Sequence, residues 1–279
     1  MDDDGNCFIC ANKDFRRSKV CIAGIPYDGT SSNRPGARFA PKAIREASHG
    51  IESYSVYQKE SLQDKSVSDM GDIPLPLGDA RFAMGIIKSF VSPILKEKKC
   101  FFLGGEHLIS LPIVDVLSNE HKNLFVVQFD AHTDLRDSWM GEKLSHASVM
   151  RRVAEIIGFE HLLQLGIRSG TEEEFKLPQR KQLLCEDFSY VDEFIKIIGK
   201  NPVYLSIDLD VLDTSIAPGV GTPEPGGRSF IELIETLAKF SSLDVVGCDL
   251  VELSPHYDSS GNSSIVAASI VKEVILNLF

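Results

Sequence analysis

The sequence predicts an α/β fold, with one domain over residues 1–279 and a mostly parallel β-sheet that carries helices on both faces. Short apolar runs alternate with helical patterns along the whole chain. The apolar runs are continuous and lack the polar alternation of a half-exposed strand, which indicates strands buried on both faces. No linker, low-complexity block or internal repeat interrupts the 279 residues. We therefore expect one domain with one central sheet.

The expected elements follow one another in a regular β-then-α order. Strands are predicted at 20–25, 99–103, 124–129, 161–167, 203–207 and 243–248. Helices, where apolar residues recur at helical spacing, are predicted at 41–48, 80–95, 108–117, 148–157, 191–198, 229–240 and 264–276. Pro41 falls in a first helical turn, where a missing N–H is tolerated. Pro93 predicts a bend near the end of the second helix.

Composition and charge exclude several classes of protein. Hydrophobic content of 43% and charged content of 25% are typical of a soluble globular protein. The net charge of −11 argues against nucleic acid and anionic membranes as partners, and it suits a small cationic substrate. No apolar run approaches the roughly 20 residues of a membrane span. The first residues, MDDDGN, are acidic and unlike a secretory signal, so we expect a cytoplasmic protein.

Four polar clusters come directly after apolar runs, at the predicted carboxyl ends of strands. They are Gly104-Gly105-Glu106-His107, Asp130-Ala131-His132-Thr133-Asp134, Asp208-Leu209-Asp210 and Asp249-Leu250-Val251-Glu252. Ligands of open parallel sheets gather at this edge. One such cluster alone is usually a solvated turn or a helix cap. Four of them at the same edge predict a common site.

Carboxylates and imidazoles in this arrangement favour a metal centre. Side chains two positions apart point the same way in an extended backbone, so the ionisable residues within each cluster are expected to converge. The candidate ligands are His107, Asp130, His132, Asp134, Asp208 and Asp210. Four carboxylates exceed the need of one divalent ion, so we infer two ions bridged by shared carboxylates. Hard oxygen ligands with imidazole and no thiolate favour Mn²⁺, and two such ions roughly 3.5–4 Å apart can hold a hydroxide at neutral pH.

The GGEH, DAHTD and SIDLDVLD segments resemble the ureohydrolases, the binuclear manganese enzymes that include arginase and agmatinase. The resemblance runs from 24–29 to 249–255, and 141–152 (GEKLSHASVMRR) is similar to the agmatinase branch. It implies an arginase-like three-layer sandwich that hydrolyses agmatine to putrescine and urea, with arginase or guanidinobutyrase activity as the alternative. It also implies a homo-oligomer, either a trimer or a hexamer.

The resemblance further implies a role for each candidate residue. One Mn²⁺ would be held by His107, Asp130, Asp134 and Asp208, and the other by Asp130, His132, Asp208 and Asp210. Glu252 would accept hydrogen bonds from the substrate guanidinium, with His146 nearby for proton transfer. Either His146 or Asp210 would give the departing amine its proton. A deacetylase-like hydrolase or a non-catalytic binding protein would be expected to lack part of this set, which is intact here.

Three further features leave alternatives open. The loop 135–145 is either a wall of the substrate pocket or an ordinary surface loop. Its Trp139, Met140 and Leu144 suit a methylene chain, whereas Arg136 would suit a carboxylate. The segment 217–227, rich in proline and glycine, is either a loop at the site rim or a connector. Arg168 would line the pocket or form a structural ion pair.

Overall fold

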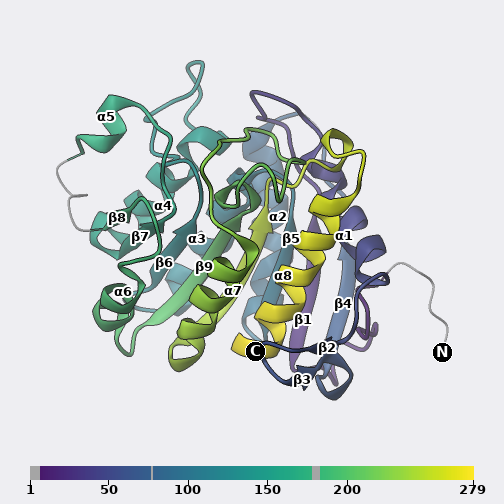
Figure 1. Ribbon diagram of the computed structural model, residues 1–279. Helices are drawn as coiled ribbons and strands as arrows, with labels where there is room; N and C mark the ends of the chain where they lie inside the picture. The colour runs from purple at the N-terminus through teal and green to yellow at the C-terminus, as the bar shows by residue number, and fades with distance from the viewer. Residues whose placement is uncertain (1–6, 77, 178–182) are drawn as a thin grey trace.

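Eight parallel strands form the centre of the protein in the computed structural model, which describes residues 7–76, 78–177 and 183–279 (Figure 1). The order across the sheet is β4-β1-β5-β10-β9-β6-β7-β8, and each neighbouring pair is parallel. The strands are β1 Val20–Ile25, β4 Val67–Asp72, β5 Lys99–Gly104, β6 Phe125–Phe129, β7 Leu162–Leu165, β8 Leu184–Cys185, β9 Pro202–Asp208 and β10 Asp244–Val251. A separate antiparallel hairpin joins β2 (Tyr54–Ser55) to β3 (Glu60–Ser61).

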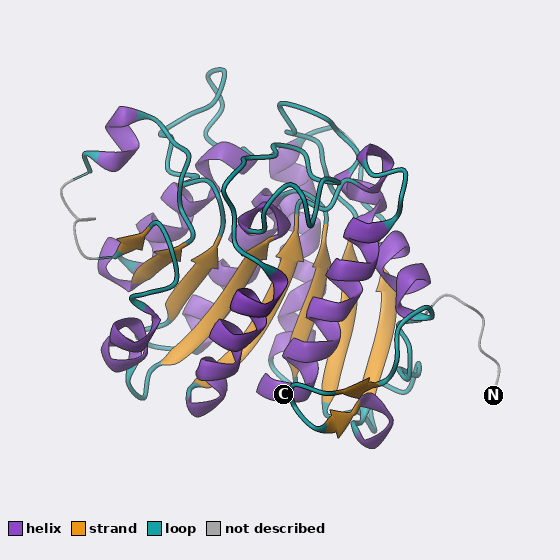
Figure 2. Ribbon diagram, in the orientation of Figure 1, coloured by secondary structure: helices purple, strands orange, loops and turns teal. Residues whose placement is uncertain are grey.

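Helices cover both faces of this sheet and complete the three layers (Figure 2). One face carries α1 Ala40–Ser48, α6 Val191–Ile198, α7 Phe230–Ala238 and α8 Asn262–Leu278, and the other carries α2 Ala80–Leu95, α3 Ser110–Glu120 and α4 Val149–Ile157. The short α5, Glu172–Phe175, follows β7. The predicted three-layer α/β fold is confirmed. Within the described ranges, no helix is both long and apolar enough to cross a membrane.

Strand β5 shows why the apolar runs are continuous. Phe101 and Leu103 pack in the core on the α1, α7 and α8 face, whereas Cys100 and Phe102 pack in the core on the opposite face. All four side chains are fully buried. Because successive side chains of a strand point to opposite faces, a sheet covered on both faces needs apolar residues at every position.

The sequence-based prediction misses both edge strands of the sheet and the end of one central strand. Strand β4 has the polar sequence VSDMGD, and the carboxylate of its buried Asp69 pairs with Arg45 of α1 at 2.8 Å and accepts from the Phe8 N–H at 2.8 Å. Strand β8 has two residues, too few for a hydrophobic pattern. Strand β10 extends to Val251, so Asp249 lies inside the strand and not after it as predicted. Tertiary pairing, which no local pattern records, decides these three cases.

The carboxyl ends of the strands meet along one edge, where long loops gather (Figure 2). Strands β5, β10, β9 and β6 are consecutive neighbours in the sheet, and each is followed by one of the four polar clusters or contains its first residue. The fold therefore brings together segments from residue 104 to residue 252.

We predict that Gly105→Ala destabilises the protein. A Cβ at Gly105 would lie 1.9 Å from the carbonyl oxygen of Tyr27, so one of the two backbones must move. Overpacking of this kind costs roughly 1–3 kcal/mol, measurable by urea or thermal unfolding. Gly85→Ala is the matched control. Gly85 lies on the exposed side of α2 with nothing within 4 Å of its Cβ position, and the change should stabilise the helix by roughly 0.5–1 kcal/mol. Equal stability of the two variants would contradict the prediction.

Candidate metal centre

His107 lies at the centre of the site, three residues after the end of β5. Its backbone N–H donates to Oε1 of Glu252 at 2.7 Å, which ties the ends of β5 and β10 together. Its Nδ1 lies 3.1 Å from a carboxylate oxygen of Asp130, 3.1 Å from one of Asp134 and 3.4 Å from one of Asp208. This nitrogen is buried and makes no hydrogen bond. Three carboxylates therefore surround one ring nitrogen away from water.

The other side of the His107 ring is fixed by buried hydroxyl groups. Ser206 donates its only hydroxyl proton to Asp249 at 2.7 Å, so it accepts the hydrogen bond from Nε2 of His107 at 2.8 Å. Asp249 also accepts from Ser110 at 2.6 Å and from Tyr204 at 2.7 Å. Because Nε2 carries the proton, Nδ1 of the neutral ring presents a lone pair toward the carboxylates.

A second group of donors adjoins the first. Nδ1 of His132 lies 2.9 Å from Oδ2 of Asp210 and 3.6 Å from Oδ1 of Asp130. Two sets of side chains could each hold a metal ion, and they are His107 with Asp130 and Asp134, and Asp130 with His132 and Asp210. Asp130 belongs to both sets. The structure thus brings together all six predicted ligands, because Asp208 also faces His107.

The convergence does not come from an extended backbone, so the reason given by the sequence is wrong. Strand β6 ends at Phe129, and Asp134 has a left-handed conformation with φ 53°. Asp208 ends β9, and Asp210 lies in the short 3₁₀ turn that follows. Glu252 is also left-handed, with φ 66°. Non-glycine residues adopt this region at a cost, and they cluster at functional sites.

Burial and mutual repulsion oppose the ionisation of these carboxylates. Burial, then the charges of Asp210 and Asp130, raise the pKa of Asp208 well above its usual value. Burial and the charge of Asp130 raise the pKa of Asp134 to about 6. Burial also acts on Asp130, but contacts with the two imidazoles outweigh it and lower the pKa of Asp130. Burial would lower the pKa of His107, yet its carboxylate contacts outweigh burial and raise it.

The donor set fits divalent metal ions. A lone pair of His107 and several carboxylate oxygens point at a common space, where like charges and acceptors repel one another. Such a group binds either a proton or a metal cation, and metal binding displaces the proton. Imidazole nitrogen mixed with carboxylate oxygen, without thiolate, is a ligand set of manganese and similar ions.

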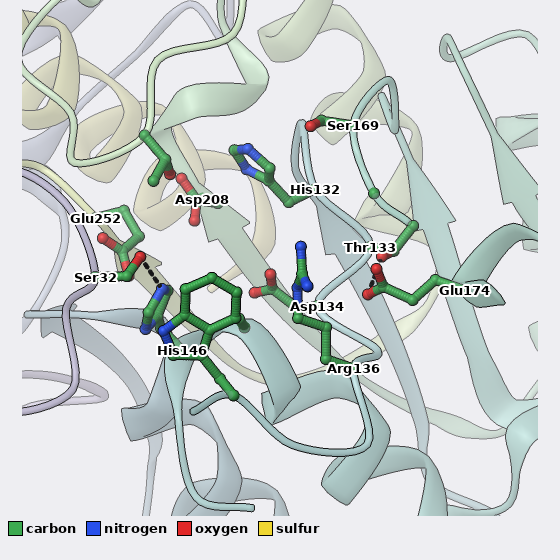
Figure 3. A pocket seen from close by; sticks show the side chains of 14 residues that line it. Ser32, His132, Thr133, Asp134, Arg136, His146, Ser169, Glu174, Asp208 and Glu252 are labelled. Atoms are coloured by element: carbon green, nitrogen blue, oxygen red, sulfur yellow. Dashed lines mark hydrogen bonds between the residues drawn. The ribbon is translucent and has the colours of Figure 1, made fainter. Parts of the chain in front are cut away.

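A pocket of about 230 Å³ opens above these donors. Figure 3 shows Asp134, His146, Asp208 and Glu252 around it, with His132 on the adjoining wall. The volume is below the roughly 300–1,000 Å³ of sites for drug-sized molecules, so the ligand is small. His107, Asp130 and Asp210 lie buried beneath the pocket.

His146 reaches the pocket from the loop before α4. Its Nε2 lies 3.0 Å from Oγ of Ser32, and its backbone N–H donates to Oγ1 of Thr30 at 3.1 Å. Thr30 in turn donates its hydroxyl proton to the buried carboxylate of Glu106, which also accepts from the Thr30 N–H at 2.9 Å. A hydrogen-bonded line therefore runs from the residue next to His107 to the far wall of the pocket.

Segment 217–227 lies at the rim of the site, so the first of its two predicted alternatives is confirmed. Thr222 lines the pocket, and the Cβ position of Gly221 lies 3.3 Å from the carboxylate of Glu252. Both predictions for Arg168 are wrong. Its guanidinium donates to backbone carbonyls, including those of Asp210 at 2.6 Å and Glu224 at 2.8 Å. Arg168 therefore fastens the rim loop to the turn that carries Asp210.

Loop 135–145 is only partly a wall of the pocket. Arg136 and Trp139 line it, with the guanidinium of Arg136 4.7 Å from the centre of the Trp139 ring. Met140 is 89% exposed at the tip of the loop, and Leu144 packs against the hydrophobic core. Two of the four singled-out side chains, Arg136 and Trp139, therefore line the pocket.

The supporting residues Ser206 and Asp249 are absent from the predicted site. Ser206 stands two positions before Asp208, so its alternation with Asp208 and Asp210 in the SIDLD segment is a usable signal. Asp249 belongs to a predicted cluster, but it is expected there to follow the strand and not to support a ligand. The structure places it beneath His107, inside the sheet.

The fold and this donor cluster define a parallel α/β protein with a candidate centre for divalent ions. The chain belongs to the arginase family, whose profile matches residues 18–277. It is 42% identical over 278 residues to the agmatinase of Bacillus cereus, which covers 98% of this chain and 96% of that protein. It is 33% identical over 271 residues to the guanidinobutyrase of Pseudomonas aeruginosa, and this match covers 92% of this chain and 85% of that protein.

A solved structure agrees with these relatives. The agmatine ureohydrolase of Thermoplasma volcanium matches with a TM-score of 0.89 and 34% identity, over 98% of this chain and 94% of that chain. The predicted family and the arginase-like sandwich are confirmed. The protein is therefore an enzyme of the ureohydrolase type, and its His and Asp cluster could hold metal ions.

We predict that Ser206→Ala weakens metal binding. The change leaves Nε2 of His107 without an acceptor and takes one of three hydroxyl donors from Asp249. Loss of a partner behind a metal-binding histidine typically costs roughly 10- to 100-fold in affinity, which calorimetric titration with Mn²⁺ would measure. Ser110→Ala is the control, because it removes another Asp249 donor and keeps the His107 contact. Equal effects of the two variants would show that the orientation of His107 is not the cause.

Proposed function

We propose that the protein hydrolyses agmatine to putrescine and urea, with two Mn²⁺ ions per chain. The observation that carries this proposal is the pair of donor sets sharing Asp130, beneath a small pocket that also presents the Glu252 carboxylate. The agmatinase and agmatine ureohydrolase among its relatives support the choice of substrate. The acidic site suits a substrate with two cationic ends.

We propose the ligand assignment that the family resemblance implies. One ion is held by His107, Asp130, Asp134 and Asp208, and the other by Asp130, His132, Asp208 and Asp210. Asp130 is supported as a shared ligand by its place in both donor sets. Asp208 is oriented for sharing because its Oδ1 accepts from the Asp210 N–H at 2.9 Å while Oδ2 faces His107. When bound, two divalent ions supply a water-derived nucleophile at neutral pH.

Glu252 is the residue proposed to bind the substrate guanidinium. Its Oε1 accepts from the His107 N–H at 2.7 Å, which fixes the plane of the carboxylate and leaves Oε2 for the pocket. Burial and the charge of Glu106 raise the pKa of Glu252 to about 8. A guanidinium beside it favours the charged form and donates hydrogen bonds to the carboxylate. The substrate carbon is thereby oriented toward the metal donors.

His146 is the proposed carrier of the proton for the departing amine. Burial lowers the pKa of His146 to about 4, so its ring is neutral and able to accept a proton. Asp210 is less suited to this step. Its Oδ1 accepts from Ala131 N–H at 3.0 Å, and its Oδ2 faces His132 at 2.9 Å. Asp210 therefore acts as a ligand in this proposal.

A second candidate substrate is a guanidino acid such as 4-guanidinobutyrate. The observation that favours it is Arg136, whose guanidinium lines the pocket above Trp139. Over residues 7–76, 78–177 and 183–279, no carboxylate lies within ion-pair distance of Arg136. A free cation there would bind a substrate carboxylate and repel the agmatine ammonium.

Urea release tests these alternatives directly. We expect the Mn²⁺-loaded protein to turn over agmatine with a higher kcat/KM than arginine or 4-guanidinobutyrate, and to carry two Mn²⁺ per chain by elemental analysis. As a control, Asp130→Ala removes the shared carboxylate, so it should lose metal and urea release together. A higher kcat/KM for 4-guanidinobutyrate would transfer the assignment to the guanidino acid. A fully loaded and active Asp130→Ala protein would contradict the two-ion centre.

We also propose that the chain forms a homo-oligomer, a trimer or a hexamer, as the family resemblance implies. Exposed large apolar side chains such as Phe82 at 62% and Met140 at 89% are compatible with contact between copies. Light scattering at micromolar concentration should give a mass of three or six times 30.8 kDa. A mass of one chain would refute the proposal.

A further inference from the structure

Asp134 needs outside support for its backbone. Its φ of 53° lies in the left-handed region, which is strained for a non-glycine residue and persists only where the surroundings impose it. This conformation turns its carboxylate back toward His107, to 3.1 Å from Nδ1. An extended backbone at Asp134 would not keep this geometry. Something in the fold must therefore hold the turn.

The residues on both sides of Asp134 are bound to one carboxylate from elsewhere in the chain. Oε1 of Glu174 accepts from Oγ1 of Thr133 at 2.6 Å and from the backbone N–H of Leu135 at 2.9 Å. Figure 3 shows the contact between Thr133 and Glu174 beside the pocket. Glu174 belongs to α5, and only 4% of it is exposed.

The second oxygen of Glu174 is anchored to its own helix. Oε2 accepts from the backbone N–H of Thr171 at 2.7 Å and from the Thr171 hydroxyl at 2.8 Å. Each carboxylate oxygen therefore accepts two hydrogen bonds. Those to Oε2 come from the helix cap, and those to Oε1 come from the loop around Asp134. A carboxylate has about four acceptor positions, so these four hydrogen bonds use its full capacity.

We propose that Glu174 is a positioning residue for the metal centre: it clamps Thr133 and Leu135 and so holds Asp134 in the left-handed conformation in which it binds metal. This inference rests on the proposed function, in which Asp134 is a ligand. Glu174 does not touch the metal donors or the reacting atoms itself. Its effect passes through the backbone of the ligand loop.

Backbone hydrogen bonds from α4 also hold Asp134, so the contribution of Glu174 is distinct from theirs. The carbonyl oxygen of Asp134 accepts from the N–H groups of Met150 and Arg151, at 3.0 and 3.2 Å, in the first turn of α4. These bonds fix one side of the peptide group and are made by backbone alone. Glu174 fixes the hydroxyl of the preceding residue, Thr133, and the N–H of the following residue, Leu135. Of these two anchors, only Glu174 can be removed by a side-chain substitution.

Metal affinity of the metal-free protein, measured with Mn²⁺ alone and without substrate, tests the clamp. Glu174→Ala should weaken binding by roughly 10- to 100-fold, as loss of a supporting partner typically does. Thr133→Val removes one donor to the clamp and should weaken binding in the same direction, whereas Thr133→Ser should restore wild-type affinity. Because Thr133 and Glu174 act through one contact, the double variant should lose less than the sum of the two single losses.

Thr171→Val is the matched control. It removes one donor from Oε2 and weakens the cap of α5, but it leaves both bonds to the Asp134 loop. It should lower the melting temperature without lowering the affinity for Mn²⁺. A loss of affinity in Thr171→Val equal to that in Glu174→Ala would assign the effect to the helix and overturn the clamp.

Two further results separate this inference from the proposed function. Wild-type metal affinity in Glu174→Ala, with a changed KM for agmatine only, would overturn the clamp and make Glu174 a substrate contact, while the metal centre stands. Wild-type affinity in Asp134→Ala would overturn the ligand assignment and, with it, the role given to Glu174.

Discussion

The structure depends on one electrostatic constraint, the burial of several carboxylates at the same edge of a parallel sheet. Asp130 is fully buried, Asp208 and Asp210 nearly so, and each lies near an imidazole nitrogen or another carboxylate. Repulsion between such groups in a medium of low dielectric is large. A cation removes it, and family membership agrees with this solution. The sheet order, the polar strand ends and the irregular loops above them all make sense as the surroundings of that cation.

Below the donors lies a layer of hydrogen bonds that fixes their orientation. Ser206 and Asp249 hold the His107 ring, and Gln128 donates to Asp130 at 2.5 Å. These groups are buried polar residues in positions where a parallel sheet otherwise needs apolar side chains. They lower the number of apolar contacts in the sheet. They also keep the donor atoms in place before metal binds.

The sequence predicts the sheet, most helices and every proposed ligand, because each depends on short patterns: an apolar run followed by closely spaced carboxylates and imidazoles. It does not predict residues that act across long separations. Glu174 is 41 positions from Thr133, and Thr30 is 76 positions from Glu106. Neither carries a local signal, because only the tertiary fold makes them neighbours. The same limit explains β4, a polar edge strand that exists through its pairing with β1.

Strand β10 follows β5, β6 and β9 in the chain but lies between β5 and β9 in the sheet. His107 stands on one side of it, and Asp130 and Asp208 stand on the other. During synthesis on the ribosome, His107 therefore remains apart from the other donors until β10 emerges and inserts between β5 and β9. The nascent chain exposes two unpaired strand edges until that moment. Completion of the donor cluster is thereby tied to completion of the sheet: a chain truncated before β10 contains Asp130, His132 and Asp210 but lacks the strand that joins His107 to them.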